Sequence, residues 1–209
     1  MAGLTLVTPP AVESVTLAEA KSHLRVETAD DDALIGDLLA AARQTVEGFL
    51  RRALITQTWR LTLDRFPRVA ERWWDGVRQG AAVVERARAI VLPRPPLSAV
   101  TSLTVFDAAD TPTVVPAGDY IVDTAAEPGR LVLRTGESWP VVGRAAAGVE
   151  VVFDAGYGAA GSAVPEAIRQ GILETVAALY DRRGEGVAEA RGLPGAAAAL
   201  LAAYRIVGL

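Results

Sequence analysis

The sequence predicts an α+β protein: a helical bundle core of two N-terminal helices plus a C-terminal long helix, with an inserted antiparallel β module. The prediction rests on three stretches of hydrophobic periodicity. Helical spacing extends to about residue 52, apolar residues alternate with polar ones from residue 55, and helical spacing returns at residue 164. We therefore expect a discontinuous helical domain, residues 1–54 and 158–209, and a β module of residues 55–157.

The first helix is predicted from its capping residues. Residues 1–15 have no clear periodicity and are predicted to form an arm. Thr16 followed by Glu19 is a capping box, in which each side chain satisfies a free N–H of the first turn. The apolar residues that follow share one face, so a short helix is expected at 17–25.

The strongest helical pattern covers residues 31–52. Its hydrophobic stripe consists of Leu34, Ile35, Leu38, Leu39, Ala42, Val46, Phe49 and Leu50. Asp30–Asp32 lie at its start and Arg51 and Arg52 at its end, where their charges complement the helix dipole. The three aspartates lack the spacing and the closing glutamate of a calcium loop, so we interpret them as helix-favouring charges and not as a metal site.

The β module begins where the period changes to two. The segment "ITQTWRLTLDRF" starts at Ile55 and alternates apolar with polar residues. Further strands are predicted at 89–93, 100–107, 119–123, 130–134 and 149–154. Turn-rich segments such as "PRPPL" and "EPGR" separate them, which favours antiparallel strands. Residues 67–88 have no readable pattern.

The C-terminal part returns to helical spacing. The stripe of this helix consists of Val164, Ile168, Ile172, Val176, Leu179 and Tyr180. Pro165 suits the first helical turn, because its missing N–H is not needed there, and Gly184 is expected to end the helix. "GEGVAEARG" is interpreted as a linker, and "LPGAAAALLAAYRIVGL" as a short helix with an apolar tail.

Gly156, Gly158 and Gly161 form a GxGxxG motif between a predicted strand and a predicted helix. This is the sequence context of a dinucleotide-binding turn. A Rossmann fold, however, needs a second parallel strand after that helix, and no strand candidate follows it. We interpret the motif as a flexible strand-to-helix connection, and no cofactor is predicted.

No residues are predicted to be catalytic or to bind a metal. The chain has no cysteine, and His23 is its only histidine, so triads and His-rich metal sites are excluded. Arg182 and Arg183 near a helix C-terminus are explained by the dipole, with contact to passing DNA as the weaker alternative. Trp73 and Trp74 are interpreted as a loop anchor or subunit contact, and a ligand-stacking platform is the alternative.

Composition excludes several classes. The 209 residues are 51% hydrophobic, which is enough for a sizeable core in one domain or in a domain with an insert. The net charge of −4 argues against sequence-specific DNA binding, which usually requires a basic excess. No apolar run reaches the roughly 18–20 residues of a membrane span, and no secretory signal is present. A soluble protein made in the cytoplasm is expected.

Taken in order, these elements resemble the head–tail connector (head-completion adaptor) family of tailed phages and phage-like gene transfer agents. The resemblance covers most of the chain. It is carried by "TLAEAKSHLRVETADDDALIGDLLAAARQTVEGFLRRALITQTWRLTLDRFP", by "LPRPPLSAVTSLTVFD", and by "VVFDAGYG" followed by "VPEAIRQGILETVAALYDRR". The first block is the most specific, because a short helix, an acidic gap, a long helix and "RALITQTW" follow one another directly.

The resemblance implies a structural virion protein and not an enzyme. Members of this family form a ring, typically of twelve subunits, beneath the portal at a capsid vertex. The ring extends the DNA channel and docks the stopper and tail. The resemblance thus implies the particle neck as location, after assembly in the bacterial cytoplasm. DNA is expected to pass through without specific binding, in agreement with the net charge of −4.

The apolar C-terminus is predicted to dock on the portal, because exposed apolar segments usually mark partner sites. The residues concerned are Leu200, Leu201, Tyr204, Ile206 and Leu209. The alternative is a helix folded back on its own subunit.

For function, one alternative is another neck or tail-completion component. A second is a small-ligand or carbohydrate binding module around Trp73 and Trp74.

Overall fold

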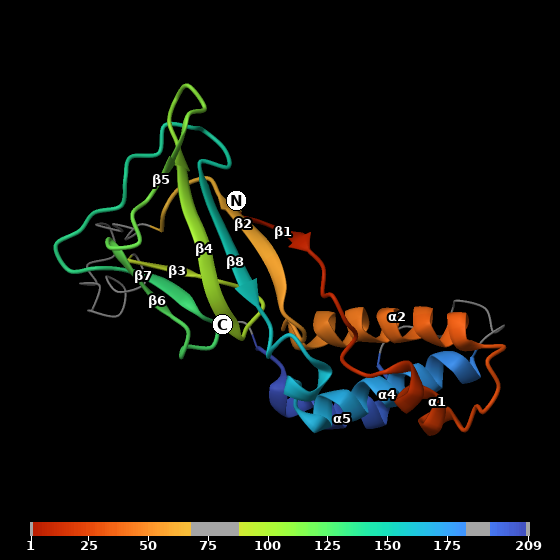
Figure 1. Cartoon of the computed structure of the whole chain (residues 1–209). Coiled ribbons are helices and arrows are strands. Elements are labelled where there is room, and N and C mark those ends of the chain that lie inside the picture. The colour runs from red at the N-terminus through yellow and green to blue at the C-terminus, as the bar shows by residue number, and fades with distance from the viewer. Residues whose placement is uncertain (1, 68–87, 183–192, 208–209) are drawn as a thin grey trace. The chain divides into compact units, whose positions relative to one another are not determined.

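The computed structural model describes residues 2–67, 88–182 and 193–207, which are the coloured parts of the ribbon in Figure 1. The chain divides into two compact units. The β unit comprises Met1–Pro9 and Gln57–Ala155, and the helical unit comprises Pro10–Thr56 and Gly156–Leu209. The chain therefore passes from one unit to the other three times. Helices and antiparallel sheets are both present, so the predicted α+β class is confirmed.

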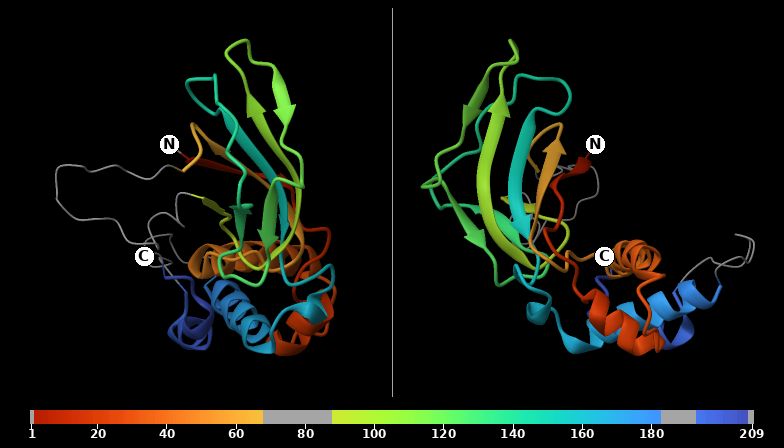
Figure 2. Two further views of the ribbon diagram at one scale, coloured as in Figure 1. Left: turned by 90° about the vertical axis from the view of Figure 1, so that its left-hand side faces the viewer. Right: turned by 45° about the vertical axis from the view of Figure 1, so that its right-hand side comes forward.

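The β unit contains two antiparallel sheets, seen from two sides in Figure 2. The five-stranded sheet has the order β1-β2-β8-β4-β5 and the three-stranded sheet the order β3-β7-β6. In chain order the strands are β1 (Ala2–Thr8), β2 (Gln57–Leu63), β3 (Ala89–Val91), β4 (Leu97–Phe106), β5 (Pro112–Val114), β6 (Tyr120–Asp123), β7 (Arg130–Leu133) and β8 (Val149–Ala155).

The central strand β8 shows how the sheet is stabilised. Its residues alternate strictly, with Val149, Val151, Phe153 and Ala155 buried. Such alternation places one face of the strand in a core. On the other face, the Thr58 hydroxyl on β2 donates to the Asp154 carboxylate at 2.6 Å. This side-chain bond adds to the ladder between β2 and β8.

Two strands were missing from the sequence prediction. Residues 1–15 were expected to form an arm within a helical domain 1–54, but β1 is a strand of the β unit and pairs with β2. Its partner follows about fifty residues later, so local periodicity gave no sign of the pairing. The other missing strand, β5, has three residues and begins with Pro112, a residue that usually breaks strands.

The helical unit contains four α-helices and two 3₁₀ helices within the described residues. They are α1 (Leu17–Leu24), α2 (Asp32–Leu50), η2 (Gly161–Ala163), α4 (Glu166–Asp181), α5 (Gly195–Leu201) and η3 (Ala202–Tyr204). The predicted capping box is confirmed. The Thr16 hydroxyl accepts the Glu19 N–H at 3.2 Å, and the Glu19 carboxylate accepts the Thr16 N–H at 2.8 Å.

One continuous apolar core joins these helices. It comprises Val15, Ala20, Ile35, Leu39, Ala42, Val46, Leu50, Leu54, Ile55, Val164, Ile168, Ile172, Val176, Ala197 and Leu201. The set contains members of both predicted stripes, which therefore face each other. Pro165 was expected in the first helical turn, but its ψ of 137° is extended, so it is the N-cap and α4 begins at Glu166.

A buried ion pair lies beside this core. Arg43 and Glu47, one turn apart on α2, are joined at 3.0 Å, and both are less than a tenth exposed. Arg43 also donates to the Glu13 carboxylate at 2.8 Å. The second oxygen of Glu47 accepts the N–H of Leu54 at 3.0 Å. Arg43 and Glu47 thus each have a further partner on another segment, as buried charges require.

The GxGxxG segment is packed against its own chain. Gly156 has a φ of +138°, and a Cβ there would lie 2.6 Å from the backbone of Ile55. The carbonyl of Gly158 accepts the N–H of Thr56 at 2.9 Å. A Cβ on Gly161 would lie 2.7 Å from the carbonyl oxygen of Ser14. The strand before the motif, β8, pairs antiparallel with both neighbours, so the motif connects a strand to a helix as expected, but it is tightly packed and not the flexible connection of the sequence prediction.

Gly156→Ala is therefore expected to destabilise the protein by about 2 kcal/mol or more, because alanine has strain at positive φ and meets backbone atoms. The melting temperature should fall by roughly 4 °C or more. Gly48→Ala is the matched control, because Gly48 lies in α2 with open space around it. That change should stabilise the helix by about 0.5–1 kcal/mol. Equal melting temperatures for the two variants, measured by circular dichroism, would contradict the packing of this turn.

Candidate interaction surfaces

The C-terminal helix α5 packs on α4 of its own chain. Leu201 is fully buried and lies over Gly171, where a Cβ would come within 2.9 Å of the Leu201 side chain. Ala197, one turn earlier, is buried as well. Small residues on both helices thus permit their close approach, and the large side chain of Leu201 enters the common core.

The residues after α5 bind the end of α2. Arg52 donates to the carbonyl of Tyr204 at 2.6 Å, and Ile206 donates its N–H to the carbonyl of Leu50 at 3.0 Å. The guanidinium of Arg205 lies 4.9 Å from the ring centre of Phe49, a cation–π distance. The last carbonyls of a helix have no partner within it. The C-terminal segment supplies one of these partners and places positive charge near this negative helix end.

This arrangement corrects part of the predicted docking site. Leu201 was expected to be available to a partner, but it is buried in the core of its own chain. Tyr204 and Ile206 are half-buried, whereas Leu200 is 39% exposed. Val207, which the sequence analysis did not select, is 79% exposed. Leu209, Trp73 and Trp74 lie outside the described residues.

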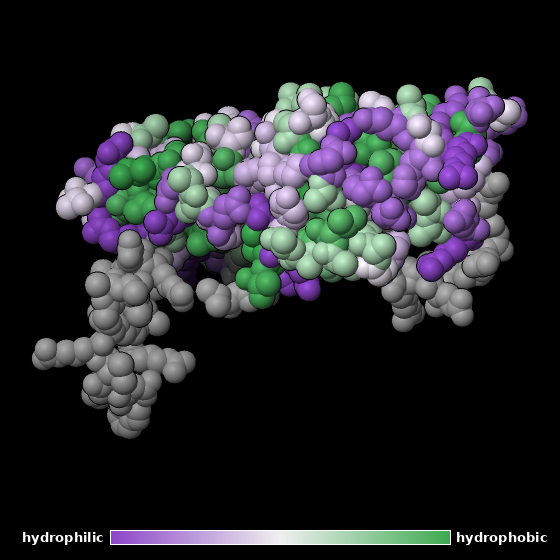
Figure 3. Space-filling view, turned by 90° about the horizontal axis from the view of Figure 1, so that it is seen from below, coloured by the Kyte–Doolittle hydropathy of each residue, from purple (hydrophilic) through white to green (hydrophobic). Residues whose placement is uncertain are grey.

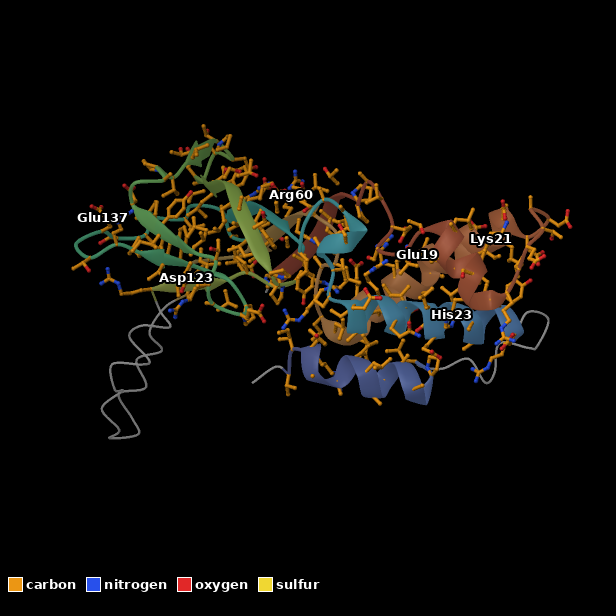
Figure 4. All side chains as sticks on the ribbon, turned by 60° about the horizontal axis from the view of Figure 1, so that its bottom comes forward. Glu19, Lys21, His23, Arg60, Asp123 and Glu137 are labelled. Carbon is orange, nitrogen blue, oxygen red and sulfur yellow. The ribbon has the colours of Figure 1, made fainter. Side chains whose placement is uncertain are left out.

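A solvent-open cavity of about 500 Å³ lies between α1 and α4. Its lining residues are Ala18, Glu19, Ser22, His23, Glu166, Arg169 and Leu173. Figure 4 labels Glu19 and His23 on α1 beside this region. Arg169 forms ion pairs with Glu19 and Glu166 and donates to the carbonyl of Ser14 at 3.2 Å. Its donors are thus used inside the chain, and the cluster connects α1, α4 and the segment before α1.

Hydrogen bonding lowers the pKa of Glu19 below its ordinary value of 4.5. The Thr16 N–H is the largest cause and the Thr16 hydroxyl the second. Burial opposes them, and Arg169 adds a smaller lowering effect. Each of these groups prefers the ionised carboxylate. The same contact with Glu19 raises the pKa of the Arg169 guanidinium.

The β unit carries a smaller cavity of about 150 Å³, lined by Arg65, Phe66, Pro67, Trp139, Pro140, Val141 and Val142. The rings of Phe66 and Trp139 stack at 4.6 Å between centres. Pockets for small molecules usually measure about 300–1,000 Å³. This cavity is below that range, and the alternative ligand site around Trp73 and Trp74 lies outside the described residues.

The described residues offer few features of a catalytic, metal-binding or membrane-spanning protein. Figure 3 shows hydrophobic and hydrophilic residues interspersed over the face that it draws. Among the described residues, no group of three or more His, Asp or Glu side chains is arranged to hold a metal ion. No helix in this part of the chain is long and apolar enough to cross a membrane.

Among the described residues, the exposed part of the apolar C-terminal segment and the exposed edge strand β1 remain as candidate contacts. Comparison with known proteins agrees. Residues 14–92 match the family model for the phage gp6-like head–tail connector protein. A comparison with curated proteins found no match.

Three similar solved structures come from gene transfer agent (GTA) particles. A chain from the neck of an empty GTA particle computed with C6 symmetry is 30% identical, with a TM-score of 0.73 over 99% of this chain and 97% of that chain. A chain from the neck of a native particle computed with C12 symmetry is 29% identical, with a TM-score of 0.72 over 99% and 97%. A chain from the virion of a native GTA particle is 27% identical, with a TM-score of 0.72 over 99% and 96%. The present chain belongs to the phage head–tail connector family.

The Glu19 cluster should make stability depend on pH. Because folding lowers the pKa of Glu19, its contribution is complete above pH 4.5 and is lost as pH falls through the lower, folded-state pKa. The melting temperature of Glu19→Gln should therefore lie below that of the wild type at pH 7, and the difference should shrink towards pH 3.

Glu27→Gln is the control for this experiment, because it removes the same charge from an exposed residue just after α1. Its melting temperature should follow that of the wild type at each pH. A difference between Glu19→Gln and wild type that stays constant from pH 7 to pH 3 would contradict the assignment.

Proposed function

We propose that this chain is a structural head–tail connector in the neck of a phage or phage-like particle. It forms a ring under the portal, extends the DNA channel and docks the stopper and tail. The observation that carries the proposal is the 30% identity, over 99% of the chain, with a chain from the neck of a GTA particle. The role is structural and not enzymatic, in keeping with the connector family.

Twelve subunits are proposed for the ring. The related necks were computed with C6 and C12 symmetry, both of which are compatible with a twelve-membered ring. Each copy then meets two neighbours through different surfaces, and the contacts close by rotation. The net charge of −4 suits a channel through which DNA passes, because each Lys or Arg contact to a phosphate adds affinity that would retain it.

The two units are proposed to have separate roles. In this proposal, α1, α2 and α4 are the bundle of a discontinuous connector domain, which was expected at residues 1–54 and 158–209 and here comprises Pro10–Thr56 and Gly156–Leu209, without β1. The β unit, expected at residues 55–157, is an insertion into that domain. The continuous core shared by α2, α4 and α5 supports this division, and so does the closure of the turn at Gly156 on the backbone of Ile55.

Portal docking is proposed for the exposed part of the C-terminal segment. Leu200 and Val207 present apolar surface there, and Tyr204 and Ile206 are half-buried beside them. Because Leu201 is buried, we assign it the role of anchoring the segment to α4. The alternative function, another neck or tail-completion component, uses the same surfaces for the tail tube in place of the portal.

The ring is tested by mass photometry of the purified protein with and without portal protein. We expect a species of about twelve times the subunit mass of 21.9 kDa in at least one of the two conditions. A cryo-EM reconstruction should then show the rotational symmetry. A protein that stays monomeric in both conditions would contradict the proposal.

Portal docking is tested with Val207→Glu, because a charge at an apolar contact is costly to bury. Co-sedimentation with portal should weaken at least tenfold. Val141→Glu is the matched control, since Val141 is 92% exposed in the β unit and lies outside the proposed site. Unchanged co-sedimentation of Val207→Glu would remove the docking assignment. If Val207→Glu still binds the portal but no longer binds the tail tube, the result would favour the alternative function, another neck or tail-completion component.

A further inference from the structure

Strand β1 is an unprotected edge of the five-stranded sheet. It pairs with β2 on one side, and no described strand pairs with its other side. All seven residues, AGLTLVT, are exposed, and none is charged or a proline. Leu4, Leu6 and Val7 are 36%, 41% and 44% exposed. An edge strand presents a row of free N–H and C=O groups, and natural proteins usually block such edges with charges, prolines or short strands.

The opposite edge of the same sheet has this protection. Strand β5 has three residues and begins with Pro112, which has no N–H to donate. Asp110, just before it, forms an ion pair with Arg144 at 2.9 Å. One sheet therefore has a blocked edge and an open one. The only irregularity in β1 is a shift of register between Leu6 and Thr8, which leaves Leu4 and Thr5 in regular pairing.

We propose that the free edge of β1 pairs, through main-chain hydrogen bonds, with a strand of an adjacent copy of this chain. The inference rests on the proposed ring, since a ring provides every copy with a neighbour at a fixed position. It also fits the composition of the strand. Backbone pairing needs no charged side chain, and the exposed leucines and valine would be covered by the incoming strand.

The size of β1 limits what the strand does by itself. Its seven residues are about a quarter to a third of the 20–30 that one side of a standard interface contains. The strand pairing therefore fixes the register of two copies within a larger contact. Removing it is expected to weaken the assembly without preventing the subunit from folding.

The test is the double substitution Leu4→Lys and Leu6→Lys, which introduces the lysines that protect natural edges. Val114→Lys is the matched control, because Val114 is 62% exposed on the blocked edge, β5. Ring assembly is measured by mass photometry over a range of concentrations, with and without portal protein. We expect the double variant to need at least tenfold more protein to form rings, and the control to assemble like the wild type.

Two further measurements keep the outcomes distinct. The melting temperature of the double variant should stay close to that of the wild type, because both side chains lie on the surface. Hydrogen exchange of the unmodified protein should slow at residues 2–8 on assembly, and it should not change at 112–114. This second measurement does not depend on how the variant folds.

The results separate the inference from the function on which it rests. The pairing of β1 would be overturned if the double variant formed rings at the same protein concentration as the wild type. It would also be overturned if hydrogen exchange at residues 2–8 did not change on ring assembly. Neither result would contradict the ring itself. Equal loss of assembly in Val114→Lys would overturn the pairing too. If wild-type protein forms no ring in either condition, the proposed function fails and the inference fails with it.

Discussion

The buried ion pair of Arg43 and Glu47 binds segments of the helical unit that lie next to the crossings between the two units. Glu13, shortly after the first crossing between the units, binds Arg43. Leu54, just before the second crossing, donates its N–H to Glu47. The carbonyl of Leu54 accepts the N–H of Tyr157, which follows the third crossing. One network of charges and backbone groups therefore organises all three crossings, and the loss of one partner from such a buried pair typically costs about 3–5 kcal/mol.

The hydrogen bonds around Arg43 and Glu47 explain how the helical core stays continuous although Gln57–Ala155 lies between its two parts in sequence. Because both ends of the insertion are held at Leu54 and Tyr157, α2 and α4 can pack together whatever lies between them in sequence. The glycines of the connection then have a structural purpose. Gly156 lets the returning chain run directly along Ile55 at a positive φ that residues with a side chain rarely adopt.

The sequence predicted well where the signal was local. The capping box of α1, the stripes of α2 and α4 and the alternation of β8 are visible within a few residues, and each agrees with the structure. The family was also recognisable from its succession of elements. The failures depend on distant partners. Strand β1 exists because β2 pairs with it, and Leu201 is buried because Gly171 leaves space for it. Neither partner can be identified from the spacing of residues along the chain.

The bonds between the C-terminal segment and α2 also have a mechanical consequence. Tyr204 and Ile206 are tied to Arg52 and to the carbonyl of Leu50. A pull on the chain end therefore loads the final turn of α2 before it reaches Leu201 in the core. Tension on the C-terminal segment would thus act first on these two hydrogen bonds, and the packing of Leu201 would bear load only after they break.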